Sequence, residues 1–127
     1  EAGSATVVFE DRAGELFVQA DKDQLIRVFG NLIKNAQQAI PDDRVGVVKL
    51  RIEESSNDIT VSVEDNGVGI PPDQLGKIFV PNFTTKTSGT GLGLAMVKAM
   101  VEGMGGQVWF NTRENEGTTF FLKLIKN

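Results

Sequence analysis

The chain has 127 residues, a formal net charge of −4, and neither cysteine nor histidine. One domain of this length buries an adequate core without disulfides or a structural metal. The missing cysteines exclude a disulfide framework and a thiolate zinc site. The missing histidines exclude a serine–histidine–aspartate hydrolase and the common zinc hydrolases. The acidic balance predicts no nucleic-acid partner, and the absence of an apolar run of about 18 residues predicts no membrane span.

Two short β-prone runs open the chain, at residues 6–10 and 16–20. Asp21, with Gln24 three residues later, predicts a helix N-cap of the capping-box type. The helix that follows is predicted to end at Pro41. Its predicted apolar face repeats at helical spacing and consists of Leu25, Phe29, Leu32, Ile33, Ala36 and Ile40.

The middle of the chain predicts a β-hairpin followed by a long polar stretch. Strands are expected at 47–53 and 59–64, with a turn at 55–58 between them. Residues 65–90 are rich in glycine and polar residues, and only 72–79 has helical character. A loop of this length in a compact domain is usually functional.

The last third of the chain predicts one helix and two strands. Residues 92–104 are apolar almost all round, with only Lys98 and Glu102 charged, which predicts a buried helix. Strands are expected at 107–112 and 118–125. No linker interrupts the pattern, so we expect a single domain over residues 1–127. Strands interleaved with helices predict an α/β sandwich with its helices on one face of the sheet.

Asn31, Asn35 and Gln38 form a polar stripe along the first predicted helix. Asparagine is a mediocre helix former, so two of them on one stripe carry a mild cost. A solvated helix face is the plain interpretation. The alternative is that the side-chain carbonyl oxygen of Asn35 binds Mg²⁺, which takes oxygen ligands and is usually completed by substrate phosphates.

A glycine-rich segment begins at Asp65, directly after a predicted strand. The next two residues, Asn-Gly, are typical of a hairpin turn, but consecutive prolines at 71–72 prevent a return strand. Gly67 and Gly69 are better explained as places where a flat ligand approaches the backbone. Asp65 then offers a carboxylate to an exocyclic amine such as that of adenine.

A second glycine-rich loop precedes the last predicted helix. Gly89, Gly91 and Gly93 free the backbone to curl, and the loop leads into a helix N-terminus, which binds anions. Lys86 adds a positive charge. The spacing fits neither a Walker A loop nor a Rossmann fingerprint, and a flexible linker is the plain alternative. Together the three pieces supply a magnesium-binding amide, an adenine-binding carboxylate and a phosphate-binding loop, the three parts of an ATP site.

Four motifs resemble, in order and spacing, those of the sensor histidine kinases. They are the N box at 31–36, the G1 box at 65–70, the F box at 78–86 and the G2 box at 89–94, with 117–120 similar to the family's last strand. The resemblance covers residues 21–125 and is closest to the nitrogen-regulation-like subgroup. It implies a Bergerat-type α+β fold with a mixed, largely antiparallel sheet, helices on one face and a mobile ATP lid over 79–90.

The resemblance also implies a role for each matching residue. Asn35 would hold Mg²⁺, Asn31 would support the phosphates or the metal, and Asp65 would bind the adenine amine. Asn31 and Lys86 are the catalytic candidates. The other implied ATP-binding residues are Lys34, Gly67, Gly69, Ile70, Phe79, Phe83, Thr85, Gly89, Thr90, Gly91, Leu92, Gly93, Leu94, Thr118 and Thr119.

The resemblance implies different roles for different members of this set. Phe79 and Phe83 would anchor the lid that closes over ATP, and Thr118 or Thr119 would assist Asp65 through water. Lys86 and the amides of 91–94 would bind the triphosphate.

The sequence departs from the subgroup in two respects. Asn82 stands where a phenylalanine is frequent, and 37–38 are glutamines where many members place a basic residue nearby, a role that Lys34 is placed to take.

The implied cofactors are ATP and Mg²⁺, and the implied partner is a histidine-bearing dimerisation domain of the same parent protein, with a response regulator downstream. The hydrolytic relatives carry a glutamate where this chain has Asn31, so we expect ATP binding with negligible hydrolysis. Because the chain has no histidine, we expect a piece of a longer protein that does not phosphorylate itself. We expect it to be monomeric and cytoplasmic, without direct membrane contact, whether or not the parent is anchored in a membrane.

Two alternatives stay open at this point. One is a stand-alone ATP-binding regulatory module, and the other is a serine kinase of the anti-sigma-factor type. A dimerising helical hairpin with a histidine upstream of Glu1 would favour the histidine kinase.

Overall fold

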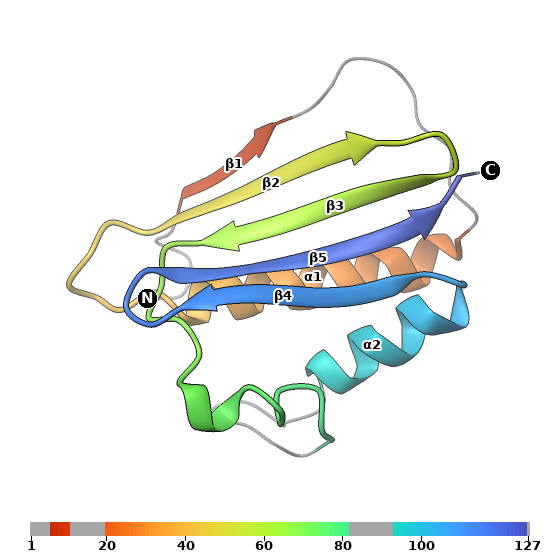
Figure 1. The fold of residues 1–127 in the computed structure, drawn as a ribbon. Helices are drawn as coiled ribbons and strands as arrows, with labels where there is room; N and C mark the ends of the chain where they lie inside the picture. Colours follow the sequence, from red (N-terminus) through yellow and green to blue (C-terminus); the bar gives the residue numbers. More distant parts are fainter. Residues whose placement is uncertain (1–5, 11–19, 82–92, 127) are drawn as a thin grey trace.

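The computed structural model describes residues 6–10, 20–81 and 93–126 (Figure 1). The elements in chain order are β1 (Thr6–Glu10), α1 (Lys22–Gln38), β2 (Val47–Glu54), β3 (Asp58–Asp65), the 3₁₀ turn η2 (Pro72–Gln74), α2 (Gly93–Gly103), β4 (Gln107–Arg113) and β5 (Gly117–Ile125). Most lie within one or two residues of the predicted elements. The predicted strand at 16–20 lies outside the described residues except for Ala20, and the helix expected at 72–79 is only the short turn η2.

The strands form one sheet in the order β1-β2-β3-β5-β4. β1 runs parallel to β2, and the other neighbouring pairs are antiparallel. Both helices pack on the same face of this sheet (Figure 1). The expected α+β sandwich with a mixed, largely antiparallel sheet is therefore confirmed. Within the described residues, neither helix has the length and apolar character needed to cross a bilayer.

The core lies between the sheet and the two helices. Alternate residues of β3 and β5 point into it, as strand geometry requires. The buried residues of the two strands are Ile59, Val61, Val63, Phe120, Leu122 and Leu124. Helix α1 adds Val28, Leu32 and Ala36, and α2 adds Val97 and Val101.

The buried row of α1 differs in part from the predicted apolar face. Leu32 and Ala36 are buried as predicted, but the third fully buried residue is Val28, which the prediction omits. Leu25 and Ile33 are only half-buried. The helix is thus rotated toward Val28 by part of a turn, and this rotation brings the polar stripe closer to the core than a solvated face would be.

The prediction of a buried α2 is confirmed only in part. Val97 and Val101 are fully buried, whereas Ala99 is exposed and Lys98 forms a surface ion pair with Glu102 at 2.6 Å. The physical reason is position, because α2 packs against α1 and the edge strand β4, and none of the described helices and strands covers its outer side (Figure 1).

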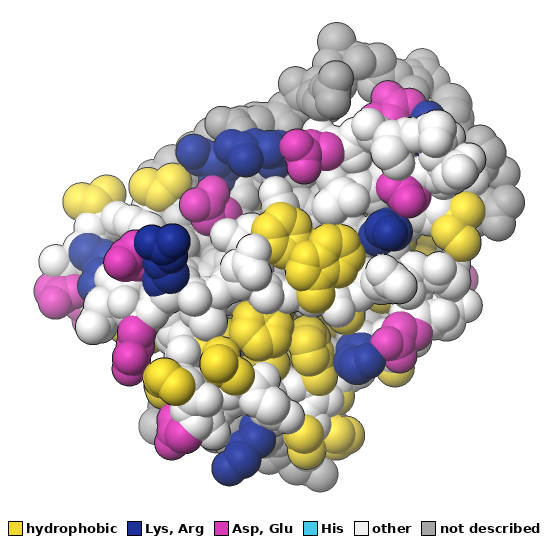
Figure 2. All heavy atoms as spheres, viewed as in Figure 1, with side chains coloured by type: hydrophobic (Ala, Val, Ile, Leu, Met, Phe, Trp, Pro, Cys, Tyr) yellow, Lys and Arg dark blue, Asp and Glu magenta, His cyan; other side chains and the backbone are white. Residues whose placement is uncertain are grey.

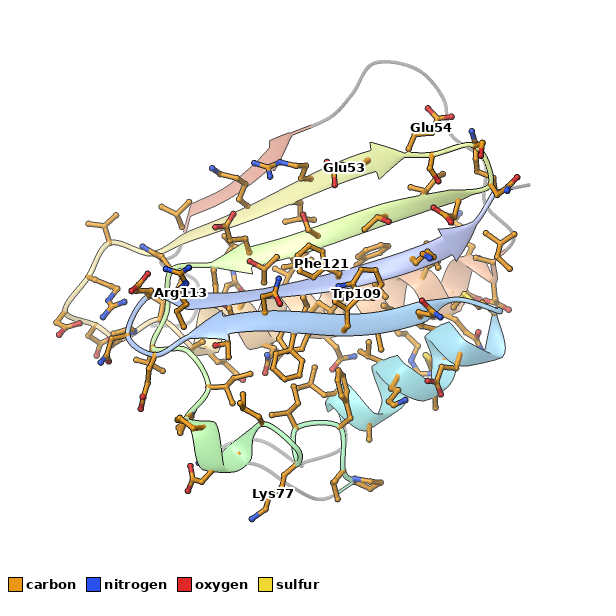
Figure 3. The ribbon with its side chains drawn as sticks, viewed as in Figure 1. Glu53, Glu54, Lys77, Trp109, Arg113 and Phe121 are labelled. Carbon is orange, nitrogen blue, oxygen red and sulfur yellow. The ribbon has the colours of Figure 1, made fainter. Side chains whose placement is uncertain are left out.

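The opposite face of the sheet carries no helix in the part of the chain that the structure describes. Trp109 of β4 and Phe121 of β5 stack there, with ring centroids 5.4 Å apart and an interplanar angle of 11° (Figure 3). Figure 2 shows an apolar patch near the middle of this face, with lysine, arginine and acidic side chains around it.

The predicted N-cap of α1 is confirmed, because the Asp21 side chain accepts a hydrogen bond from the Gln24 backbone N–H at 3.1 Å. Replacing Asp21 with alanine is expected to lower the free energy of unfolding by about 1 kcal/mol, since one N–H at the helix start loses its partner. Urea denaturation measures the change. The exposed Asp43, which caps no helix, gives the control: Asp43→Ala is expected to change stability by less than about 0.5 kcal/mol. An equal loss in both variants would contradict the capping role.

Candidate functional site

Asp65 is the last residue of β3 and is 4% exposed. Its Oδ1 atom accepts two backbone hydrogen bonds, from Gly67 N–H at 2.8 Å and from Thr118 N–H at 3.2 Å. One donor belongs to the loop after β3, and the other belongs to the start of β5, the neighbouring strand (Figure 1). Burying a carboxylate is costly unless hydrogen-bond donors offset the lost contact with water. The two N–H groups supply that offset and hold an acidic group at one end of the sheet.

The two candidate threonines of β5 lie on opposite faces of the sheet. Thr118 is 5% exposed and faces the core with Asp65. Thr119 pairs with Glu64 across the ladder and belongs to the helix-free face, because successive strand residues alternate. The structure therefore brings Thr118 to Asp65 and places Thr119 on the other face, and the assignment of either threonine as a helper stays a prediction.

Thr112 lies beside the candidate site and was not among the residues predicted from the sequence. It lies on β4 directly opposite Thr118, and the two hydroxyl oxygens are 2.8 Å apart. Its Oγ1 also accepts from Ile70 N–H at 2.9 Å and lies 3.2 Å from the Gly117 carbonyl oxygen. The sequence could have indicated this pair, because a β-hairpin whose turn spans 113–117 places Thr112 opposite Thr118.

Gly67 and Gly69 face the chain's own backbone. A Cβ on Gly67 would lie 2.4 Å from the Ala39 carbonyl oxygen at the end of α1. Gly69 has φ +77°, and its Cβ would lie 2.4 Å from the Arg113 carbonyl oxygen. The glycines therefore let this loop fit between α1 and the β4–β5 turn, which is a packing role in addition to the predicted approach of a ligand.

Helix α1 and the start of α2 meet at the polar stripe. Asn31 donates from Nδ2 to the Arg27 carbonyl at 2.8 Å, and its Oδ1 would lie 3.0 Å from a Cβ on Gly93. Asn35 is half-buried beside the buried Ala36. The stripe thus borders the core next to the N-terminus of α2, and the structure brings two of the four sequence motifs together. Lys34 is exposed and Gln38 is half-buried.

Phe79 anchors the segment that leads into the predicted lid. Its ring centroid lies 6.1 Å from that of Phe110 and 6.3 Å from that of Phe120, which places it against the core. Ile70 and Leu94 are half-buried and pack against the same core. The remaining predicted lid and phosphate residues lie outside the described residues: Phe83, Thr85, Lys86, Gly89, Thr90, Gly91 and Leu92.

The donor set fits Mg²⁺ bound together with a phosphate ligand rather than a metal held by protein alone. In the ranges that the structure describes, no group of three or more acidic side chains gathers to hold a metal. Mg²⁺ usually keeps several waters and takes one or two protein oxygens plus substrate phosphates. The amide oxygen of a half-buried Asn35 matches that requirement.

Known proteins resemble this chain over nearly its whole length. The family described as histidine kinase-, DNA gyrase B-, and HSP90-like ATPase matches residues 20–127. The sensor histidine kinase ZraS of Escherichia coli is 47% identical over 110 residues, which cover 87% of this chain and 23% of that protein. The sensor protein kinase WalK of Staphylococcus saprophyticus is 36% identical over 97% of this chain and 21% of its own length. The chain therefore spans less than a quarter of these relatives.

Solved structures show the same fold. The catalytic domain of histidine kinase ThkA, in a nucleotide-free form, matches with a TM-score of 0.84 and 37% identity over 97% of this chain and 80% of that chain. Full-length ShkA, described in complex with AMPPNP, matches with a TM-score of 0.82 and 26% identity over 99% of this chain and 27% of that chain. The chain belongs to the histidine kinase-, DNA gyrase B- and HSP90-like ATPase family, as a catalytic domain of the sensor histidine kinase type.

Proposed function

We propose that this chain binds Mg-ATP and donates its γ-phosphoryl group to a histidine on a separate phosphoacceptor domain in two-component signalling. Asp65 is the observation that carries the proposal. Its carboxylate is buried at the end of β3 and is oriented by the N–H groups of Gly67 and Thr118. A fixed, buried acceptor of this kind suits the exocyclic amine of adenine, and a charged acceptor strengthens that hydrogen bond.

The polar stripe of α1 supports the phosphate side of the proposal. Asn31 and Asn35 are four residues apart, about 6 Å along the axis and close to one helical turn, so both point to the same side of α1. The Oδ1 atom of Asn31 lies against Gly93, where α2 begins. The exposed backbone N–H groups of a helix start attract phosphate oxygens. Mg²⁺ held by Asn35 would supply neutralisation of the phosphate charge during phosphoryl transfer.

The chemistry of Asn31 favours transfer over hydrolysis. Its neutral amide donates to the Arg27 carbonyl and cannot accept a proton from water as a carboxylate can. Positioning and charge neutralisation supply most of the catalysis of phosphoryl transfer. A site without a strong base beside the phosphates can therefore still pass the group to a nucleophile that another domain supplies.

The proposal is tested by mixing the chain with Mg-ATP and a histidine-bearing dimerisation fragment of the parent protein. The expected result is acid-labile phosphate on the fragment, with ATP turnover by the chain alone near background. Asn35→Ala is expected to lower the transfer rate at least about 100-fold, because the metal loses its protein ligand. The measurement is radiolabel on the separated fragment before and after acid.

The other outcomes each identify a different function. Rapid ATP hydrolysis by the isolated chain, lost in Asn35→Ala, would contradict the interpretation of Asn31. Acid-stable phosphate on a protein serine would indicate the serine-kinase alternative. Nucleotide binding with no transfer to any histidine would indicate a regulatory nucleotide-binding module.

A further inference from the structure

Arg44 lies between α1 and β2, outside the sequence motifs of the site, and is half-buried. Its Nη1 atom lies within hydrogen-bond distance of three main-chain carbonyl oxygens. These belong to Asn66 at 2.8 Å, Gly67 at 3.0 Å and Asn115 at 3.1 Å. The first two are in the loop directly after Asp65, and the third is in the β4–β5 turn that precedes Thr118. One guanidinium group therefore ties together the two segments that flank the buried carboxylate.

The strongest link runs through a single peptide unit. The carbonyl of Asn66, which accepts from Arg44, and the N–H of Gly67, which donates to Asp65 Oδ1 at 2.8 Å, belong to the same peptide group. A trans peptide is planar, with its C=O and N–H pointing in opposite directions. The bond from Arg44 on one edge therefore aims the N–H on the other edge at Asp65. A charged donor on the carbonyl also polarises the peptide and strengthens the bond that its N–H makes.

The β4–β5 turn carries the second link. Asn115 has φ +66°, and its backbone N–H donates to the Val68 carbonyl at 2.6 Å. Arg44 holds the carbonyl of the same residue. This turn sets where β5 begins, and hence where Thr118 N–H reaches Asp65. Both donors to the Asp65 carboxylate thus come from segments that Arg44 connects.

The fold of the loop does not depend on Arg44 alone. The Asn66 side chain accepts from Val47 N–H at 2.8 Å and donates to the Val45 carbonyl at 2.8 Å. Val68 N–H donates to the Ala39 carbonyl at 3.0 Å. These bonds keep the loop on the start of β2 and on the end of α1 when the guanidinium is removed. Losing Arg44 is therefore expected to loosen the orientation of the 66–67 peptide rather than to unfold the domain.

We propose that Arg44 is a positioning residue for adenine recognition, which acts on Asp65 through the 66–67 peptide and the β4–β5 turn. This inference rests on the proposed ATP-binding function. A carboxylate accepts a hydrogen bond from the 6-amino group of adenine but repels the 6-oxo group of hypoxanthine. The proposal is that Arg44 sharpens this discrimination by holding Asp65 in place. Arg44 does this without contacting the nucleotide or its phosphates.

The test compares the binding of two nucleotides by calorimetry, a non-hydrolysable analogue of ATP and the matching analogue of inosine triphosphate. The wild-type chain is expected to prefer the adenine nucleotide. Arg44→Met is expected to weaken adenine-nucleotide binding about tenfold and to leave inosine-nucleotide binding unchanged, so that the preference collapses. Arg44→Lys keeps the charge but lacks the planar fork, and is expected to retain part of the preference.

The matched control is Arg113→Met. Arg113 lies on β4 beside the same turn, but its side chain is 82% exposed and its ion pair with Glu116 is at 3.9 Å. The labelled side chain at the end of β4 can be seen in Figure 3. This variant is expected to keep the wild-type preference, because a side chain on the surface does not hold the 66–67 peptide.

The possible outcomes distinguish failure of the proposed function from failure of the proposed role of Arg44. Failure of the wild-type chain to bind either nucleotide would refute the proposed function itself. Wild-type binding with an unchanged preference in Arg44→Met would overturn the role of Arg44 alone. An equal loss for both nucleotides would also overturn it, since that pattern indicates a general structural role. If Arg44→Met does not fold, Arg44→Lys decides, and a full wild-type preference in that variant overturns the proposal.

Discussion

An Asp65→Asn variant is expected to bind a non-hydrolysable ATP analogue at least about 100-fold more weakly than the wild-type chain and to remain folded. The amide oxygen can still accept from Gly67 and Thr118, which both donate to Oδ1 in the wild type. The new amide N–H₂ group, however, places a donor where the adenine amine also donates. A lost charged hydrogen bond with an unmatched donor costs on the order of 3 kcal/mol, which corresponds to about 100-fold in affinity.

Calorimetry measures the affinity, and thermal unfolding with circular dichroism measures the fold. The matched control is Asp58→Asn at the other end of β3, where the carboxylate accepts from Ser55 Oγ at 2.6 Å. That variant is expected to bind the analogue as the wild-type chain does. Unchanged affinity in Asp65→Asn would remove the adenine assignment, and loss of the fold would make Asp65 a structural residue instead.

Gly117→Ala is expected to lower the free energy of unfolding by about 3 kcal/mol or more, the largest stability effect among these variants. Gly117 begins β5 with φ +132°, a conformation that side chains rarely adopt. An added Cβ would lie 2.0 Å from the Asp65 carbonyl oxygen and 3.1 Å from Asn66 Cα. Both neighbours are backbone atoms, at the end of β3 and at the residue that follows it, so they cannot rotate away as a flexible side chain can. Urea denaturation measures the loss.

Gly30 supplies the opposite case. It lies within α1, and a Cβ there would meet nothing within 4 Å. Gly30→Ala is therefore expected to raise stability by about 0.5–1 kcal/mol, because alanine loses less backbone entropy in a helix.

A wild-type stability for Gly117→Ala would contradict the prediction for that residue. It would show that the start of β5 can shift, and would weaken the link between this turn and Asp65.

The sheet and the first helix were predictable because their sequence signals are local. Alternation of apolar residues in 59–64 predicts β3 and its buried face, and Asp21 with Gln24 predicts the start of α1. The degree of burial of α2 was not predictable. An apolar sequence fits both a central helix and one at the edge of a sheet, and only the packing of α2 against β4 decides between them.

For the candidate site as well, features set by neighbouring residues were predictable, whereas features set by contacts between distant segments were not. The position of Asp65 at the end of β3 was predictable, because a carboxylate that follows an alternating strand and precedes Asn-Gly stands out in the sequence. Choosing Thr118 over Thr119 needed the register of β5 against β3, since a shift of one residue exchanges the two faces. Thr112 and Arg44 act on main-chain groups of distant segments. Such bonds depend on the path of the backbone rather than on any residue pattern.

The stacked pair on the helix-free face gives the chain a built-in optical probe. Trp109 is the single tryptophan, it is 37% exposed and stacked on Phe121, and it lies across the sheet from Asp65. Its emission reports whether β4 and β5 remain paired, because unfolding separates the two rings and exposes the indole to water. Asp65 belongs to the buried face of β3, so a nucleotide at the proposed site would lie on the face of the sheet opposite the indole. Fluorescence thus follows the integrity of the sheet separately from occupancy of the site, and it distinguishes a variant that cannot bind from one that cannot fold.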